Sequence, residues 1–463
     1  MTLALDTLNA LERRAKARLN IPAKPPGPPS SLMPLHIRHL MQDQIQFMQN
    51  LQHTHGDCVY FRLGRLKFYL IHDPELLQQV LLEHNSVMIK DPFARDLKEL
   101  LGNGLLLNEG SSWRQHRKLA APKLKRTQIA SYAERMASAA HHTTNTIKAH
   151  QPFDLWQEMM DLTLHIVVET LFGLTYHPQA KDVGHAIEVA MEHYDAEKNS
   201  LWYFIPRQVP SLKRARFHEA KKDLDRIIRD MIKERSKLPP GDDLLWKLIE
   251  ATHQNGHHLD ETQLRDEALT MFLAGHETTA LAITYAFDAL ARNPTIEEKL
   301  HKELAALPED QPLGLESLAH LPYTQAIFKE TLRLYPPAWI LGRQAIQDVQ
   351  LGPWHVPKDS ILVSSPYIMH RKPEIFDDPL TFKPERWLDE NFEKNIPRHG
   401  YLPFGGGPRI CIGNHFASME AILVIATLAK SWRFTLNDPS PLQFDPFITL
   451  RPTKPVMVTP VPR

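Results

Sequence analysis

The sequence is poor in cysteine. Only two cysteines, Cys58 and Cys411, occur among its 463 residues. Two are too few for a disulfide framework or for a zinc or iron–sulfur site, each of which needs about four ligands. So few cysteines in so long a chain are typical of a reducing compartment, and we therefore expect a cytoplasmic protein.

The sequence also lacks a net charge and a long apolar segment near its start. Lysine plus arginine number 54, and so do aspartate plus glutamate. This balance gives no global reason to expect a nucleic acid partner. The first residues, Met1–Asp6, contain no basic region and no apolar core, and charged residues follow at Glu12–Arg14. We therefore expect neither a signal peptide nor a transmembrane anchor.

No linker divides the chain. Its one proline- and glycine-rich run, Pro25–Pro29, lies close to the N-terminus, where it suits a stiff, extended lead-in. We predict a single domain over residues 1–463, with a lead-in helix at 1–24 and a proline-rich segment at 25–34.

The apolar periodicity predicts a mainly α protein with small β-sheets. Alternating residues over Cys58–Ile71 indicate a hairpin with Gly64 at its turn. From about Pro74 to Lys302 the 3.6-residue period of helices dominates. Short strands are predicted over Val349–Val363, and an apolar helix over Phe416–Leu428.

One predicted helix is unusually long. Asp260 can cap its start, with Gln263 at the capping-box position, and no breaker follows before Asn293–Pro294. At ~1.5 Å per residue such a helix extends about 48 Å, so we expect it to cross the protein interior.

The middle of this helix, Ala274–Thr279, contains residues that a buried helix does not favour. Gly275 lowers helix stability by about 1 kcal/mol relative to alanine, and Glu277 and Thr278 place an acid and a hydroxyl in an apolar run. These costs indicate a local function, with room for a ligand and water against the helix. The segment also begins like the zinc-protease motif His-Glu-x-x-His, but Ala280 replaces the second histidine, which disfavours zinc hydrolysis.

Cys411 lies in the sequence Phe-Gly-Gly-Gly-Pro-Arg-Ile-Cys-Ile-Gly. Three consecutive glycines let the backbone approach a large flat ligand, and a single thiolate suffices for haem iron. The segment resembles the cytochrome P450 signature Phe-Gly-x-Gly-x-Arg-x-Cys-x-Gly at every fixed position. The resemblance implies that Cys411 binds the iron of haem b (iron protoporphyrin IX) and that Phe404, Arg409 and Gly413 contact the cofactor.

Further motifs resemble the same family, in the same order along the chain. Ala274–Thr279 is similar to the oxygen-binding segment of the family's distal helix, which implies that Thr278 stabilises activated oxygen and Glu277 relays protons. Glu330 and Arg333 share a helix face. With the segment Pro384–Trp387 they resemble the family's buried structural triad, completed by Arg386.

The resemblance also assigns residues to the haem propionates and to the substrate. Anionic propionates need charged donors. Trp113 and Arg117, four residues apart on a helix, together with Arg343 and Arg409, match the family's positions. The segments that line the family's pocket are almost entirely apolar here and include Phe272, Ala274, Ala338, Ile340 and Ile448.

These motifs identify the chain as a member of the cytochrome P450 family, with haem between a long distal helix and a proximal cysteine-loop helix. The implied activity is a monooxygenase that inserts one atom of O2 into an apolar small molecule. We expect no appended flavin or iron–sulfur module. Electrons from NAD(P)H would therefore arrive through separate partners, a ferredoxin or flavodoxin and its reductase. The alternatives are a peroxide-driven peroxygenase and a non-enzymatic haem-thiolate sensor.

Two finer expectations concern the partners. Arg65 and Tyr69 resemble the arginine–tyrosine pair that holds the carboxylate in some bacterial fatty-acid hydroxylases, which favours a fatty acid, with terpenoids and steroids next. A basic cluster on and after the helix that carries Trp113 is predicted to steer an acidic electron donor; it comprises Arg114, Arg117, Lys118, Lys123, Lys125 and Arg126.

The first prediction tests the iron ligand. Cys411→Ala should abolish the red-shifted Soret band that thiolate ligation gives the reduced carbon monoxide complex, because the iron loses its sulfur ligand. Cys58→Ala should leave the band intact. The reverse pattern in absorption spectra of the two variants would show that the ligand is Cys58.

Overall fold

The computed structural model describes residues 24–29, 33–176, 184, 186, 189–191, 212–253, 259–308 and 313–463. The chain divides into two compact units. Unit 1 comprises Met1–Arg95, Ile340–Pro379 and Ile396–Ile410, and unit 2 comprises Asp96–Trp339, Leu380–Asn395 and Cys411–Arg463. The single domain over 1–463 stays a prediction.

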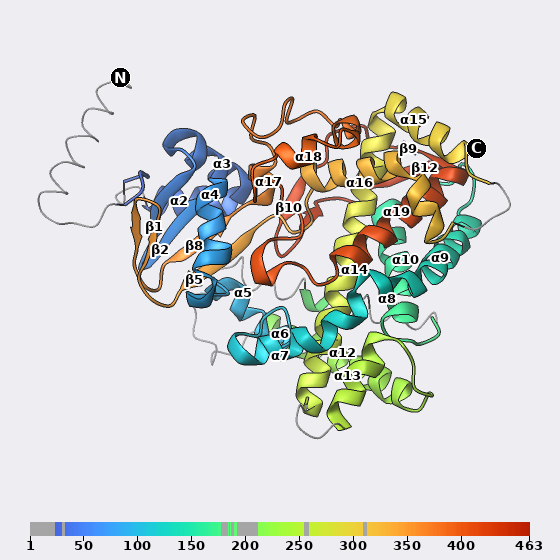
Figure 1. Ribbon diagram of the computed structural model, residues 1–463, viewed down its shortest axis with the longest axis horizontal. Coiled ribbons are helices and arrows are strands. Elements are labelled where there is room, and N and C mark those ends of the chain that lie inside the picture. Colours follow the sequence, from blue (N-terminus) through green and yellow to red (C-terminus); the bar gives the residue numbers. More distant parts are fainter. Residues whose placement is uncertain are drawn as a thin grey trace, which may run out of the picture. The chain divides into compact units, whose positions relative to one another are not determined.

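Unit 1 is built on a five-stranded sheet in the order β1-β2-β8-β5-β3. Strands β1 (Cys58–Leu63) and β2 (Leu66–Ile71) form the predicted hairpin, with Gly64 at φ +60° in the turn. β2 pairs in parallel with β8 (Ile361–Ser364), which pairs antiparallel with β5 (Leu341–Ala345). The sheet therefore places strands from distant parts of the chain side by side (Figure 1).

Helices and a second small hairpin complete unit 1. An apolar core under the sheet joins Tyr69 and Leu81 to Val349, Leu362 and Leu402. The remaining elements are α2 (Met33–Gln42), α3 (Gln44–His55), α4 (Pro74–Gln78), the π-helical turn Gln79–Glu83, the 3-10 turns Asn85–Val87 and Gly407–Arg409, β3 (Met88–Ile89), α5 (Pro92–Asp96), β6 (Val349–Leu351), β7 (Trp354–Val356) and α17 (Pro366–Met369).

The proline-rich lead-in is attached to this sheet. The carbonyl of Pro26 accepts a hydrogen bond from the Tyr60 N–H at 2.9 Å. A Cβ added to Gly27 would lie 1.8 Å from the Tyr60 carbonyl oxygen, so only glycine allows the chain to pass this close. The predicted lead-in helix at 1–24 lies, apart from Lys24, outside the described residues.

Unit 2 is mainly helical. Its helices are α6 (Lys98–Leu101), α7 (Gly110–Ala120), α8 (Arg126–Ile129), α9 (Ala133–Thr146), α10 (Leu155–Thr170), α12 (Leu212–Ser236), α13 (Leu244–His253), α14 (Glu261–Arg292), α15 (Pro294–Ala305), α16 (Pro322–Leu334), α18 (Phe392–Asn395) and α19 (Asn414–Ser431). Short 3-10 turns span Ala121–Leu124, Ala130–Tyr132, Glu316–His320 and Pro384–Leu388. Two small sheets contain β4 (Phe153–Asp154), β9 (Trp432–Leu436) and β12 (Met457–Pro462), and β10 (Phe444–Pro446) and β11 (Leu450–Pro452).

Helix α14 is the predicted long helix, and it is buried along most of its 32 residues. Asp260 accepts from the Gln263 N–H at 2.7 Å, and the Gln263 side chain accepts from the Asp260 N–H at 3.0 Å, which completes the capping box. Helices α10, α16 and α19 pack around it (Figure 1). A Cβ on Gly275 would lie 3.1 Å from Val167 Cγ2, so this glycine permits the close approach of α10.

The mainly α class with small sheets is confirmed, as are the hairpin, the strands after Val349, and helices α14, α16 and α19. Among the described residues, no helix combines the length and the apolar character that crossing a membrane would require.

Candidate active site

Cys411 is exposed, although the surrounding residues partly shield its thiol from water. It precedes α19, whose N-cap is Gly413. Burial raises the pKa of the Cys411 thiol, while a hydrogen bond from the Gly413 backbone and the Arg117 charge oppose that increase. The N-terminus of an 18-residue helix also favours a thiolate. One reachable sulfur could supply a single ligand to a metal centre.

Helix α7 brings Trp113 and Arg117 together in the same unit. The Arg117 guanidinium carbon lies 5.7 Å from the centre of the Trp113 ring, a cation–π distance. Burial lowers the pKa of Arg117, and the proximity of Cys411 raises it. A positive charge is thus held near the thiol, and Trp113 lies beside that charge.

Helix α14 has one accessible window in its buried middle. Ala274 is exposed and Thr278 half-buried, whereas His276, Glu277 and Thr279 are buried. Ala274 and Thr278 are four residues apart and share a helix face. The Thr278 hydroxyl donates to the Ala274 carbonyl at 2.9 Å, so this carbonyl has a side-chain donor. The window offers a small apolar side chain and a hydroxyl.

Glu277 faces a different element. Its carboxylate accepts hydrogen bonds from Thr449 Oγ1 at 2.7 Å and from Arg451 Nε at 2.6 Å. Burial raises the pKa of Glu277, but the Arg451 charge and the hydrogen bonds from Arg451 and Thr449 outweigh it and hold the pKa below its usual value. The carboxylate is therefore ionised and bound to the segment that precedes and begins β11.

The hairpin of β10 and β11 joins two of the predicted pocket segments. The indole N–H of Trp339 donates to the Phe447 carbonyl at 2.8 Å, and the Leu450 N–H donates to the Pro337 carbonyl at 2.9 Å. Ala338 and Ile448, the predicted pocket residues in these segments, are both half-buried. Ile340, the next predicted residue, is half-buried and is the first residue of the unit 1 segment Ile340–Pro379.

Phe272 does not fit the predicted pocket. It has no exposed surface and packs against Phe172 with ring centres 5.5 Å apart. Two residues along a helix turn a side chain by about 200°, so Phe272 and Ala274 lie on opposite faces of α14. We therefore correct the prediction and assign Phe272 to the core between α10 and α14.

The carboxylate of Glu330 is the centre of a buried cluster. Arg333 donates to it from Nε at 2.8 Å and from Nη2 at 2.9 Å, and Arg386 Nε lies at 3.2 Å. The Trp387 indole and the Lys383 backbone N–H each donate to it at 2.8 Å. All hydrogen-bonding directions of one carboxylate are thus used to fix the 3-10 turn Pro384–Leu388 on α16.

The other predicted cofactor-binding residues belong to unit 1. Arg343 is buried on β5, and its Nη1 donates to the Gly342 carbonyl at 2.7 Å. Arg409 ends the 3-10 turn Gly407–Arg409 and is half-buried, as is Phe404. Gly407 has φ +66°, and a Cβ there would lie 2.2 Å from the Leu81 carbonyl oxygen, so the turn requires this glycine.

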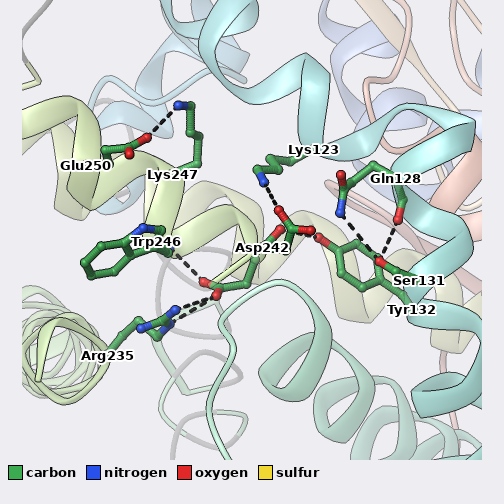
Figure 2. A network of polar contacts seen from close by, with 10 residues as sticks. Lys123, Gln128, Ser131, Tyr132, Arg235, Asp242, Trp246, Lys247 and Glu250 are labelled. Carbon is green, nitrogen blue, oxygen red and sulfur yellow. Dashed lines mark hydrogen bonds and ion pairs between the residues drawn. The ribbon is translucent and has the colours of Figure 1, made fainter. Parts of the chain in front are cut away.

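The basic cluster is only partly exposed. Lys123 forms an ion pair with Asp242 at 2.6 Å and is 16% exposed, within a polar network that also holds Arg235, Tyr132 and Trp246 (Figure 2). Arg117 is turned toward Trp113. The exposed cations are Arg114, Lys118, Lys125 and Arg126.

Arg65 and Tyr69 do not form a carboxylate site. Arg65 is exposed at the hairpin turn, whereas Tyr69 is fully buried and its hydroxyl donates to the His355 carbonyl at 3.2 Å. The guanidinium of Arg65 is thus exposed in the turn before β2, while the Tyr69 hydroxyl on β2 already has an acceptor.

Sequence reasoning missed the partners that complete these clusters. Trp387 was visible only as part of a motif, and neither Thr449 nor Arg451 was recognised as a ligand of Glu277. An isolated arginine directly after a predicted pocket segment was the one signal that could have drawn attention to Arg451.

His276 is buried, and among the described residues no group of three or more His, Cys, Asp or Glu side chains is placed to hold a metal ion.

Comparison with known proteins agrees with these motifs. The family model described as cytochrome P450 matches residues 25–460. Cyclooctatin synthase of Streptomyces melanosporofaciens is 34% identical over 402 residues, covering 86% of this chain and 87% of that protein. Cyclooctat-9-en-7-ol 5-monooxygenase of the same organism is 32% identical over 401 residues, with 86% of each chain covered. Pentalenene oxygenase of Streptomyces avermitilis is 31% identical over 408 residues, covering 87% of this chain and 89% of that protein.

Solved structures show the same fold. The crystal structure of CYP175A1 from Thermus thermophilus aligns with a TM-score of 0.75 and 29% identity, covering 92% of this chain and 97% of that one. A six-coordinated cytochrome P450 from another strain of Thermus thermophilus aligns with a TM-score of 0.70 and 28% identity, covering 90% of this chain and 98% of that one.

The Glu330 cluster yields a stability prediction. Glu330→Gln leaves two buried arginines without their counter-charge, which should lower the free energy of unfolding by about 3–5 kcal/mol. The matched control is Glu393→Gln, because Glu393 is 55% exposed and pairs with Lys329 on the surface. We expect that control to change stability by less than about 1 kcal/mol. Equal midpoints for the two variants in guanidinium unfolding would contradict the structural role of Glu330.

Proposed function

Because the chain belongs to the cytochrome P450 family and is a monooxygenase by that membership, we propose that Cys411 is its haem ligand and that its substrate is a cyclic terpenoid. The observation that carries the proposal is the accessible Cys411 thiol at the N-terminus of α19, with the Arg117 charge beside it. When bound through a thiolate, haem supplies the iron at which dioxygen is reduced and split.

The residues near Cys411 fit such a cofactor. The Gly413 backbone and the α19 N-terminus stabilise sulfur as a thiolate, and a bound metal ion would remove the remaining cost of its burial. Trp113 and Arg117 are proposed donors to a haem propionate. Arg343, Phe404, Arg409 and Gly413 are also proposed to contact the cofactor, as the family resemblance implies.

We assign the proposed oxygen chemistry to the accessible face of α14 that carries Ala274 and Thr278. Thr278 offers a hydroxyl at an accessible helix face, and Ala274 keeps that face clear of bulk. Glu277 is the nearest acid along the chain, but its carboxylate is bound to Thr449 and Arg451. Proton delivery through Glu277 therefore requires it to leave those partners.

The residues proposed to contact substrate favour an apolar molecule without a carboxylate. Ala274, Ala338, Ile340 and Ile448 are all apolar and incompletely buried. Each square ångström of apolar surface removed from water contributes about 25 cal/mol. The fatty acid that the sequence favoured loses its support, because Tyr69 is buried and Arg65 is solvated. The relatives named for cyclooctat-9-en-7-ol and pentalenene carry substrate names of an alcohol and a hydrocarbon, neither with an acid group.

Electrons are proposed to come from NAD(P)H through a ferredoxin or flavodoxin and its reductase. The exposed cations Arg114, Lys118, Lys125 and Arg126 lie on and just after α7, the helix that carries Arg117. An acidic carrier that docks on this surface would approach the part of unit 2 that holds Cys411.

Ligand titration tests the substrate. Cyclic terpenoid hydrocarbons and their mono-alcohols should shift the haem spin state of the purified protein at lower concentration than fatty acids of equal carbon number. Ala274→Phe should weaken that response while keeping the carbon monoxide Soret band, because it fills the window on α14. Arg65→Ala should leave all affinities unchanged. Tight fatty-acid binding that depends on Arg65 would overturn the terpenoid assignment.

Salt dependence tests the docking surface. Replacing Arg114, Lys118, Lys125 and Arg126 by glutamine should slow reduction by an acidic ferredoxin roughly tenfold at low salt, because steering by complementary charge is lost. The difference from wild type should shrink above 0.1 M salt, where the screening length is about 10 Å.

A charge-matched control removes four exposed cations of α12 instead, Arg216, Lys222, Arg229 and Lys233. Stopped-flow reduction of this control should match the wild type. An equal effect of both quadruple variants would show that net charge alone, and no local surface, governs the encounter.

A further inference from the structure

The β10–β11 hairpin is attached to α14 at two points. The Tyr285 hydroxyl donates to the Leu450 carbonyl, and the Glu277 carboxylate accepts from Thr449 and Arg451. Tyr285 and Glu277 are two helix turns apart, about 12 Å along the axis. β11 is therefore held along the middle of α14, next to the segment that carries Thr278.

The two members of the predicted acid–alcohol pair point in different directions. Successive residues of a helix are about 100° apart around its axis. Glu277 is 2% exposed and bound to the hairpin, whereas Thr278 belongs to the accessible face of Ala274. The carboxylate cannot reach the Thr278 face while both hydrogen bonds to the hairpin persist.

Thr449 belongs at once to the hairpin turn and to this carboxylate site. The turn is closed by a hydrogen bond from the Phe447 N–H to the Thr449 carbonyl at 3.2 Å. Phe447 and Ile448 at its tip are half-buried, while Thr449 is buried with its hydroxyl on Glu277. Displacement of Ile448 by a bound molecule therefore moves the residues that hold the acid.

We propose that Thr449 and Arg451 are positioning residues that hold Glu277 against β11 until substrate contacts the hairpin turn, an inference that rests on the proposed function. Once released, the Glu277 carboxylate turns toward Thr278, accepts a proton from solvent water, donates it at the Thr278 side and returns to its ionised form. The hairpin then couples recognition of substrate to delivery of protons, so that proton delivery is slow without substrate.

The charge state of Glu277 gives a readout that needs no turnover. The charged and titratable groups around it are Arg451 on β11, His276 and Tyr285 on α14, and Asp161 on α10, which faces His276. Arg451→Met removes the arginine bonded to Glu277 but keeps the burial of the carboxyl, which should become protonated at neutral pH. Infrared spectra should show a protonated carboxyl band in this variant that is absent from wild type and from Arg451→Met/Glu277→Gln.

The second readout is the ratio of NADH consumption with substrate to consumption without it. In Arg451→Met this ratio should fall about fivefold or more, the lower end of typical coupling between two sites. Arg451→Lys, which keeps a cation, should restore most of the ratio, and Thr449→Val should lower it less. The matched control is Arg433→Met, which breaks another arginine–glutamate pair of unit 2, with Glu297 at 3.0 Å.

The positioning role of Arg451 and the proposed haem-thiolate function are tested by different measurements. A wild-type infrared spectrum and consumption ratio in Arg451→Met would overturn the positioning role, even if the wild-type carbon monoxide spectrum shows thiolate-bound haem. A wild-type spectrum without the thiolate Soret band would overturn the proposed function, while the infrared bands would still report whether Arg451 holds Glu277. If Arg451→Met does not fold, the same comparison is made with Thr449→Val, where an unchanged ratio would count against the proposal.

Discussion

Burial of α14 along its length is the constraint on which unit 2 depends. An acidic side chain on a buried helix needs a hydrogen-bond donor or a counter-charge from a neighbouring group, because burying it without one is costly. The buried acids of the helix have such partners. Asp266 accepts from the Asn103 N–H at 2.6 Å, and Glu267 lies 2.5 Å from His116 of α7. Glu277 binds Arg451 at 2.6 Å, and Asp288 binds Arg292 one turn later at 2.8 Å. The loop after α6, helix α7 and strand β11 are therefore fixed against α14 by the polar groups that helix burial would otherwise disfavour.

Local signals were sufficient to predict most of the fold. The capping box of Asp260 and Gln263, the break at Asn293–Pro294 and the glycine turn at Gly64 each act within a few residues of one another. Partners distant in sequence were not predictable in the same way. Arg451 is 174 residues from Glu277, and no periodicity or spacing relates them. The triad was recognised through a family motif, which named Arg386 but left the role of Trp387 unstated.

In the candidate site, too, some features could be predicted from nearby residues and others could not. Gly275 and Thr278 indicated space beside α14, and the structure shows different surroundings on the two faces concerned. Gly275 admits Val167 of α10, whereas Ala274 is exposed on the face it shares with Thr278. Phe272 was assigned to the pocket from its segment alone. The helical period places it on the opposite face, so the angle around the helix was a better guide than proximity along the chain.

The thiol of Cys411, the proposed haem ligand, depends on its surroundings for its charge state. Burial favours the protonated thiol, and the Gly413 backbone, the Arg117 charge and the N-terminus of α19 favour the thiolate. These stabilising groups come from the adjacent helix and from α7, so the motif supplies the sulfur and only part of its environment. A metal ligand must be deprotonated. Under the proposed ligation, iron bound at Cys411 would complete a balance in which α7 and α19 already oppose the cost of burial, and the packing of these helices would then be a condition for cofactor affinity.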